Sequence, residues 1–234
     1  MIMIITQFKP FVSVCTPTYN RRQYIKRLIK VFDAQDYPKD RLEWIVVDDG
    51  TDKVADLFRN HPQVKYFDFC SKMPIGKKRN IMHQLTTGDI IVYMDDDDYY
   101  PPCRITHAVE RLQENPKALC AGSSKLYVYF SNLDNIYLFG PYNETHATAN
   151  TFAFHRNLLD VTSYDDDAFV SEEKYFLKNY TIPFVQLDPF KTILTISHNT
   201  NTFDKKNIIQ YAKKSNKKIH TFISEPKIRS LFVS

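Results

Sequence analysis

The feature that most constrains this chain is a series of short apolar runs that alternate with helical patterns between residues 11 and 94. The runs lie at 11–17, 42–49, 64–69 and 89–94. Those at 42–49 and 89–94 are continuously apolar, as expected for strands that are buried on both faces. Strands that alternate with helices predict an α/β fold built on a doubly wound, mostly parallel sheet with helices on both faces.

Apolar residues recur at helical spacing between these runs. The positions from Ile25 to Phe32 follow an i, i+3, i+4, i+7 pattern, and Asn20 is the expected N-terminal cap. We expect a short helix at 52–60 and a longer helix at 76–88 that ends near its last glycine. These helices connect the four predicted strands.

The regular alternation stops after residue 101. We expect a helix at 101–116, strands within 118–130 and 135–142, a helix at 171–180 and an extended run at 182–197. This order predicts a mixed, partly antiparallel second half. The predicted organisation is one domain over 1–203, with halves at about 10–105 and 106–203, followed by a partly helical tail over 204–234.

The tail is the basic part of the chain. Residues 204–234 hold eight Lys and Arg against Asp204 and Glu225, a net charge of +6 within a total of +4, so residues 1–203 carry −2. A solvated surface helix is the favoured reading of this tail. Peripheral contact with an anionic membrane stays open, and no nucleic acid partner is expected.

The cysteines and the apolar segments bear on the compartment. Cys15, Cys70, Cys103 and Cys120 form no C-x-x-C pair, which argues against a zinc site and a disulfide framework. The first ten residues make a poor signal peptide, and no run approaches the length of a membrane-spanning helix. We therefore expect a cytoplasmic protein with reduced thiols.

Polar clusters follow three of the four predicted strands. They are Thr16 to Asn20, "TPTYN"; Asp48 to Gly50, "DDG"; and Asp95 to Asp98, "DDDD". Each could be only a turn, a helix cap or a solvated loop. Parallel strands, however, place all three at one edge of the sheet, where open α/β sheets bind ligands.

The acidic run Asp95 to Asp98 predicts a site for a hard divalent cation. It lacks the glycine and glutamate spacing of an EF-hand loop. Mg²⁺ and Mn²⁺ prefer carboxylate oxygens and commonly keep substrate phosphates as further ligands. In an extended D-x-D segment, Asp95 and Asp97 share one direction, while Asp96 and Asp98 point elsewhere and should meet backbone amides or cations.

The segment "IGKKRN" (75–80) places three basic residues at the start of a helix. A helix N-terminus favours anions, and Arg79 could also hydrogen-bond a base or a ribose. Lys77 and Lys78 are equally consistent with a basic first turn on a surface helix.

These motifs and their order resemble the family 2 glycosyltransferases. The resemblance rests on "VSVCTPTYNRRQYIKRLI", "LEWIVVDDGTD" and "IGKKRNIMHQLTTGDIIVYMDDDDYYPP", and it covers about residues 10–105 closely and the rest loosely. It implies a GT-A fold whose first half binds the nucleotide and whose second half binds the acceptor. It also implies an inverting transfer from a nucleotide-sugar, usually a UDP-sugar, with Mn²⁺ or Mg²⁺.

The resemblance also implies roles for individual residues. The first cluster would hold base and ribose, Asp48 or Asp49 and Arg79 would contact the base, and the D-x-D pair would face the sugar and the metal. The implied nucleotide contacts are Pro17, Thr18, Tyr19, Asp48, Asp49, Arg79, Asp95 and Asp96. The implied metal ligands are Asp97 and Asp95, with His198 as a third ligand or only a polar loop residue.

An inverting enzyme needs a base opposite the leaving diphosphate. In the family this is an acidic residue at the start of a helix in the second half, and "FVSEEKYFL" resembles that motif. Glu173 is the implied base and Glu172 the alternate. The pair departs from the commoner Glu-Asp, and acidic residues also favour a first helical turn for stability alone. "YDDDAF" (164–169) is a competing acidic cluster.

Two other functions remain as alternatives. A sugar nucleotidyltransferase uses a related sheet and a metal, but no Gly-rich triphosphate loop is evident near the N-terminus. A non-catalytic nucleotide-sugar binding module would need the same motifs. The sequence leaves the acceptor open as a glycan, a protein or a lipid.

Overall fold

The computed structural model describes residues 9–168, 173–198 and 209–233. Its main sheet has the strand order β3-β2-β1-β4-β8-β5-β9. The strands are β1 Val12–Thr18, β2 Leu42–Asp48, β3 Val64–Asp68, β4 Ile90–Tyr93, β5 Cys120–Gly122, β8 Ala153–His155 and β9 Phe184–Gln186. Strands β1 to β4 pair in parallel, and β8 runs antiparallel between β4 and β5. The predicted α/β class, doubly wound with a mixed second half, is confirmed.

Helices cover both faces of this sheet. They are α1 Arg22–Asp33, α2 Ile75–Leu85, α3 Arg104–Glu114, α4 Glu173–Phe176, α5 Pro189–Thr192, α6 Ile219–Phe222 and α7 Pro226–Arg229. One apolar cluster joins α1 and α3 to the sheet, and a second joins α2 and α4 to its other face. The 3₁₀ turns are Lys39–Arg41, Ala55–Phe58, Ala149–Thr151 and Arg156–Asp160.

The continuous apolar runs are explained by burial on both faces. Successive side chains of a strand point to opposite sides. Val14 and Val46 accordingly belong to the cluster under α1, whereas Cys15 and Ile45 belong to the cluster under α2. All four are fully buried.

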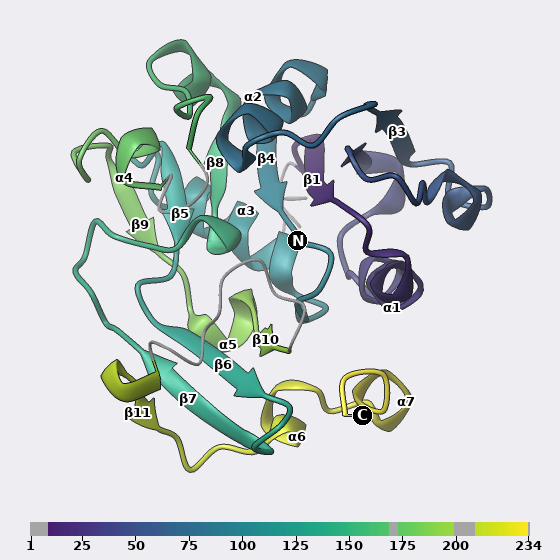
Figure 1. The fold of residues 1–234 in the computed structure, drawn as a ribbon. Helices are drawn as coiled ribbons and strands as arrows, with labels where there is room; N and C mark the ends of the chain where they lie inside the picture. The colour runs from purple at the N-terminus through teal and green to yellow at the C-terminus, as the bar shows by residue number, and fades with distance from the viewer. Residues whose placement is uncertain (1–8, 169–172, 199–208, 234) are drawn as a thin grey trace, which may run out of the picture.

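A second, smaller sheet lies below the first in Figure 1 and leads to the chain end. Its order is β10-β6-β7-β11, with β6 Leu126–Phe130, β7 Asn135–Phe139, β10 Thr195–Ser197 and β11 Lys213–Lys214. Beyond it, Phe222, Ile223 and Phe232 are buried in the main core. The end of the predicted tail is helical in part, and it is packed against the body of the protein.

Several local predictions were wrong. The run 182–197 is interrupted by α5, because the Asp188 side chain accepts a hydrogen bond from the Phe190 amide (2.9 Å) and Pro189 begins a helical turn. The region 52–60 contains only the 3₁₀ turn Ala55–Phe58. Of the helix expected at 171–180, the structure shows α4, a single turn; residues 169–172 lie outside the described residues.

Asn20 does not cap α1, where the residue at the cap position is Arg21. Asn20 adopts a left-handed φ of 53°, and its Oδ1 accepts hydrogen bonds from the amides of Thr51 (2.8 Å) and Asp52 (3.0 Å). It therefore ties the loop after β1 to the loop after β2. Gly88 lies three residues beyond the end of α2 and approaches Ser13 of β1 too closely for a Cβ atom.

Within the described residues, the helices are too short or too polar to span a bilayer.

The packing of the chain end predicts a stability effect for Phe222→Ala. The Phe222 ring is 7% exposed and lies 5.1 Å from the rings of both Phe190 and Tyr127, centroid to centroid. We expect a loss of about 3 kcal/mol in unfolding free energy, measured by denaturant titration, because the variant leaves a cavity. Val233→Ala, at a position 46% exposed, is the control and should change little. An unchanged midpoint for Phe222→Ala would contradict this packing.

Candidate active site

The three polar clusters meet at one sheet edge, as predicted. Thr18 of β1 pairs with Asp48 of β2, and Cys15 pairs with Tyr93, the last residue of β4. The carboxyl ends of β2, β1 and β4 are therefore adjacent in that order. This is the edge at which open α/β sheets bind ligands.

Asp48 holds the loop after β2 in shape. It is fully buried, and its Oδ1 accepts the amide of Gly50 (2.8 Å). Its Oδ2 accepts the amide of Val54 (3.2 Å) and the hydroxyl of Tyr66 (2.5 Å). Oδ2 thus already accepts two donors, and only Oδ1 keeps capacity for a further one.

Asp49 forms a buried ion pair with Lys78 of α2. The Asp49 carboxylate also accepts the amide of Met73 (2.7 Å), and the Lys78 ammonium donates to the carbonyl of Thr18 (3.2 Å). Burial lowers the pKa of Lys78, and the hydrogen bond that Lys78 donates to Asp49 opposes this shift. The pair therefore joins α2 to the ends of β1 and β2.

Pro17 and Tyr19, two of the predicted nucleotide contacts, remain partly exposed at this edge, whereas Thr18 is buried. The Lys72 ammonium lies 4.7 Å from the centroid of the Tyr19 ring. The edge thus offers an aromatic face beside positive charge.

Arg79 lies deeper than its predicted role at the base suggests. It is 3% exposed, and its guanidinium carbon is 4.3 Å from the Tyr93 ring centroid and 5.7 Å from that of Tyr164. The Tyr93 hydroxyl is 2.6 Å from His83 Nε2. Burial lowers the pKa of His83 to about 3, so its imidazole is neutral and can accept this hydrogen bond. The guanidinium of Arg79 therefore packs against the rings of Tyr93 and Tyr164.

The acidic run alternates in burial, although residues 96–98 form a turn and not the extended segment that was predicted. Asp96 and Asp98 are 6% and 3% exposed, whereas Asp95 and Asp97 are partly exposed. Burial, followed by the charge of Asp97, raises the pKa of Asp96 well above its usual value, and hydrogen bonding to Thr18 opposes the shift. Asp95 and Asp97 are therefore the less buried pair, and the Asp97 side chain is 15% exposed.

Asp98 has a structural role, as expected. Its Oδ1 accepts the amide of Ile196 in β10 (2.8 Å), and its Oδ2 accepts the Asn150 side-chain amide (3.2 Å). These contacts bring β10 to the acidic run. His198 follows β10 by one residue and is thereby carried to the site.

Asp97 and His198 meet. Asp97 Oδ2 is 3.1 Å from His198 Nε2, and His198 Nδ1 is 3.2 Å from the Tyr24 hydroxyl. Two ligands about 2.1 Å from one octahedral ion are themselves about 3 Å apart, so the pair fits a shared Mg²⁺ or Mn²⁺. In the described part of the chain, Asp95 does not complete a group of three such side chains with them. The fit therefore requires other oxygens, from a diphosphate or water.

Sequence reasoning missed the cations that face the acidic run. Arg21 Nη1 is 3.9 Å from Asp97 Oδ2, and Arg27 Nη2 donates to the Asp97 carbonyl (2.6 Å). Both belong to the segment that follows "TPTYN". Since α1 begins at the ligand edge, the basic spacing of "RRQYIKR" could have indicated them.

Glu173, the predicted base, is the first residue of α4 and is partly buried. Burial and the charge of Glu173 both raise the pKa values of Tyr142 and Tyr180. Its alternate, Glu172, lies outside the described residues. In the competing cluster, Asp166 accepts a hydrogen bond from Asn80 of α2 (2.7 Å), so that segment runs along α2.

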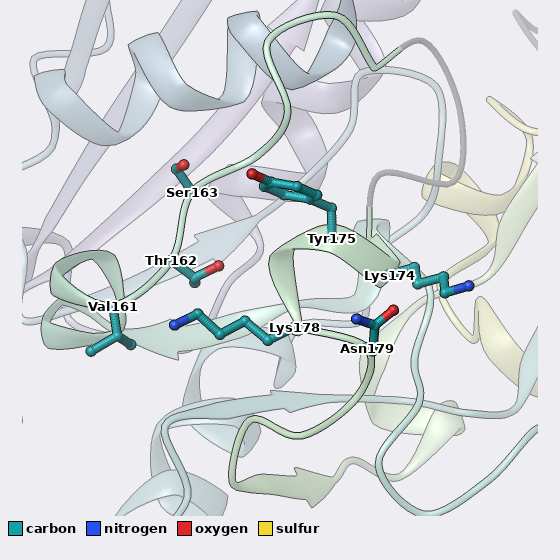
Figure 2. Close-up of a pocket in the computed structure, with 7 residues that line it drawn as sticks. All are labelled: Val161, Thr162, Ser163, Lys174, Tyr175, Lys178 and Asn179. Carbon is teal, nitrogen blue, oxygen red and sulfur yellow. The ribbon is translucent and has the colours of Figure 1, made fainter.

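A hollow of about 600 Å³ lies between α4 and the segment 161–163 (Figure 2). Its lining residues are Val161, Thr162, Ser163, Lys174, Tyr175, Lys178 and Asn179. Lys174 directly follows Glu173, and Ser163 directly precedes Tyr164, whose ring lies 5.7 Å from the Arg79 guanidinium carbon. The hollow is therefore lined by neighbours of the predicted base.

Comparison with known proteins agrees with this geometry. The sequence model of glycosyl transferase family 2 matches residues 13–160. The poly(ribitol-phosphate) beta-N-acetylglucosaminyltransferase TarS of Staphylococcus aureus is 37% identical over 93 residues, which are 37% of this chain and 16% of TarS. The GalNAc(5)-diNAcBac-PP-undecaprenol beta-1,3-glucosyltransferase of Campylobacter jejuni is 35% identical over 96 residues, 38% of this chain and 30% of that enzyme.

Solved structures share the fold. A crystal structure of S. aureus TarS has a TM-score of 0.65 at 21% identity, over 79% of this chain and 60% of that one. The mannosyltransferase PcManGT of Pyrobaculum calidifontis, in complex with GDP-Man and Mn²⁺, has a TM-score of 0.66 at 18% identity. The match covers 97% of this chain and 70% of PcManGT.

The fold and the edge described above define a GT-A protein. The chain belongs to glycosyl transferase family 2, because the family model matches more than half of it. The predicted resemblance is confirmed. The matched regions span less than a third of the two curated relatives' own lengths.

The buried pair predicts a stability effect for Lys78→Met. The variant leaves the Asp49 carboxylate buried beside an apolar side chain. We expect a loss of about 3–5 kcal/mol in unfolding free energy, measured by denaturant titration. Lys77→Met is the matched control, because the neighbouring Lys77 is exposed and should change stability little. Equal midpoints for the two variants would contradict a structural role for the pair.

Proposed function

We propose that this protein is a metal-dependent, inverting glycosyltransferase that moves a sugar from a UDP-sugar to an acceptor hydroxyl. The observation that carries the proposal is the contact between Asp97 and His198, just after the carboxyl end of β4 and beside the carboxyl ends of β1 and β2. A ligand pair in this place can hold the metal of a nucleotide diphosphate at the edge where the nucleotide would lie.

The similar proteins support a nucleotide-sugar donor. S. aureus TarS has been solved with UDP-GlcNAc, and PcManGT with GDP-Man and Mn²⁺. We propose UDP for this chain, and Mn²⁺ or Mg²⁺ as the cofactor. When bound, the metal neutralises charge on the leaving diphosphate.

The residues at the edge have distinct proposed roles. Pro17, Thr18 and Tyr19 hold base and ribose, with the exposed Tyr19 ring as the stacking face. Asp48 or Asp49 accepts a hydrogen bond from the base. Arg79, which is buried against the Tyr93 ring, contacts the base once its guanidinium turns toward the edge. The nucleotide base would thus bind to Asp48 or Asp49, whose side chains are already fixed by hydrogen bonds and the ion pair with Lys78.

The acidic run orients the donor and its metal. Asp95 and Asp96 face the ribose and the sugar, while Asp97 and His198 ligate the metal, with Asp95 as a further ligand. The partly exposed positions of Asp95 and Asp97 leave room for these contacts. Asp96 is buried, and its burial, followed by the charge of Asp97, raises its pKa.

Glu173 takes the proton from the acceptor hydroxyl as that oxygen attacks the anomeric carbon, with Glu172 as the alternate base. Glu173 is the first residue of α4, in the half of the chain that we propose binds the acceptor. The acceptor is a glycan, a protein or a lipid-linked sugar; the C. jejuni relative is named for a lipid-linked substrate.

The tail and the compartment also belong to this proposal. We propose a cytoplasmic enzyme whose exposed lysines after residue 212 contact anionic lipid when the acceptor is membrane-bound. Lys213, Lys214, Lys217 and Lys218 are all exposed. Their attraction to an anionic surface follows from charge.

Asp97→Ala should abolish metal-dependent nucleotide binding. We expect UDP affinity in the presence of Mn²⁺, measured by calorimetry, to fall by more than about a hundredfold, because even outer-shell partners of a metal contribute 10–100-fold. Asp40→Ala, a change at an exposed position in the turn before β2, should bind as the wild type does. Unchanged affinity in Asp97→Ala would count against the metal role.

Glu173→Gln should separate binding from chemistry. The variant should bind UDP and Mn²⁺ normally but lose about 10²–10⁴-fold in transfer rate, the usual contribution of a general base. Glu172→Gln distinguishes the two candidates, and Glu114→Gln is an exposed control on α3. Transfer by the Glu173 variant at the wild-type rate would assign the base elsewhere.

A donor screen with Mn²⁺ and a hydrolysis readout would identify the sugar.

A further inference from the structure

A partly buried arginine of α1, Arg27, contacts the acidic run. Arg27 Nη2 donates a hydrogen bond to the backbone carbonyl of Asp97 (2.6 Å). Its guanidinium carbon lies 4.3 Å from the Tyr24 ring centroid and 4.7 Å from the Phe232 ring centroid. Arg27 therefore contacts the metal-ligand residue on one side and the chain end on another.

Burying a guanidinium is costly unless nearby charge compensates it. Burial lowers the pKa of Arg27, and the charges of Asp97, Asp98 and Asp96 act in the opposite direction. Since several carboxylates stand at this one turn, the arginine offsets repulsion that would otherwise open it.

Phe232 joins the same support from the C-terminal segment. It is 3% exposed, and its ring meets Tyr99 edge-on at 5.6 Å between centroids. Tyr99 comes directly after the acidic run and is tied to Leu194 by two backbone hydrogen bonds, of 3.1 and 2.8 Å. Phe232 thus contacts Arg27, which bonds to the run from α1, and Tyr99, the residue that directly follows the run.

We propose that Arg27 is a positioning residue for Asp97, and that Phe232 near the chain end holds Arg27 in place. The inference rests on the proposed function, because it takes Asp97 as a ligand of the donor's metal. Fixing the carbonyl oxygen fixes the peptide plane of Asp97, and hence the direction in which its side chain leaves the backbone. The carboxylate is then presented to His198 without rearrangement.

A consequence is that the chain end takes part in donor binding without touching the donor. The segment 226–233 begins with α7, which packs near α1, and both lie at the lower right of Figure 1. The basic residues of this segment can remain in solvent while Phe232 supports the site. This proposed role of Phe232 in donor binding does not depend on any contact between the tail and a membrane.

The first experiment titrates Mn²⁺ into the full chain at saturating UDP and compares Arg27→Met with Lys26→Met. Lys26 is exposed on the same helix, so its variant removes an equal charge without the contact. We expect Arg27→Met to weaken Mn²⁺ binding roughly tenfold, as for loss of a hydrogen bond from a charged donor. Lys26→Met should bind as the wild type does. Arg27→Lys, which keeps a charged donor, should recover part of the affinity.

Phe232→Leu tests the chain end and guards against misfolding of the Arg27 variant. It keeps an apolar side chain but removes the ring face, so we expect about a threefold loss of Mn²⁺ affinity, the range of one cation–π contact. Val233→Leu is the neighbouring control at a partly exposed position. All variants are measured well below their melting temperatures, which are recorded separately.

The outcomes separate the inference from the proposed function. If the wild type binds Mn²⁺ with UDP, and Arg27→Met and Phe232→Leu bind equally well but melt earlier, the two residues are only structural and the inference is wrong. If the wild type binds no UDP in the presence of Mn²⁺, the proposed function fails, and the inference fails with it. Weaker Mn²⁺ binding in both variants, with partial recovery in Arg27→Lys, supports the inference.

Discussion

The compensation of four adjacent carboxylates is the constraint on which the rest of this structure depends. The run Asp95 to Asp98 follows a strand that is buried on both faces, and Asp96 and Asp98 are themselves buried, so their charges need partners within the protein. The protein divides them: Asp98 accepts a backbone amide of β10, Asp96 is buried with a raised pKa, and Asp97 faces Arg21 and His198. The second sheet and the chain end can be understood as the means of bringing these partners to the run.

A second set of buried charges makes the neighbouring loops rigid. Asp48 shapes the turn after β2, and the Asp49–Lys78 pair ties α2 to the same edge. Ion pairs of this kind give little net stability over an apolar core, but they fix geometry and are costly to break. At this edge a fixed geometry is what a nucleotide site requires, because a base and a diphosphate must be held at the same time.

Much of the fold could be predicted because it follows from local patterns of apolar residues in the sequence. Continuous apolar runs require burial on both faces, and helical patterns between them permit only a parallel, doubly wound sheet. The edge at which Thr18, Asp48 and Asp95 gather follows from that topology alone. The errors arose where short polar segments decide local structure. Asp188 caps a turn inside an apparently extended run, and Asn20 bonds across to the next loop instead of capping its own helix.

The sequence by itself determined the family, the sheet and the edge at which the acidic run lies, because strand burial and strand order are local and topological properties. It also predicted that Asp95 and Asp97 differ in burial from Asp96 and Asp98, but the structure achieves this in a turn and not in an extended segment. Only the tertiary structure decided which groups meet these carboxylates. Arg21 and Arg27 contact Asp97, and Phe232 packs on Arg27. The structure also chose between the two readings of His198 by bringing it to Asp97. Contacts over such separations depend on how the whole chain packs.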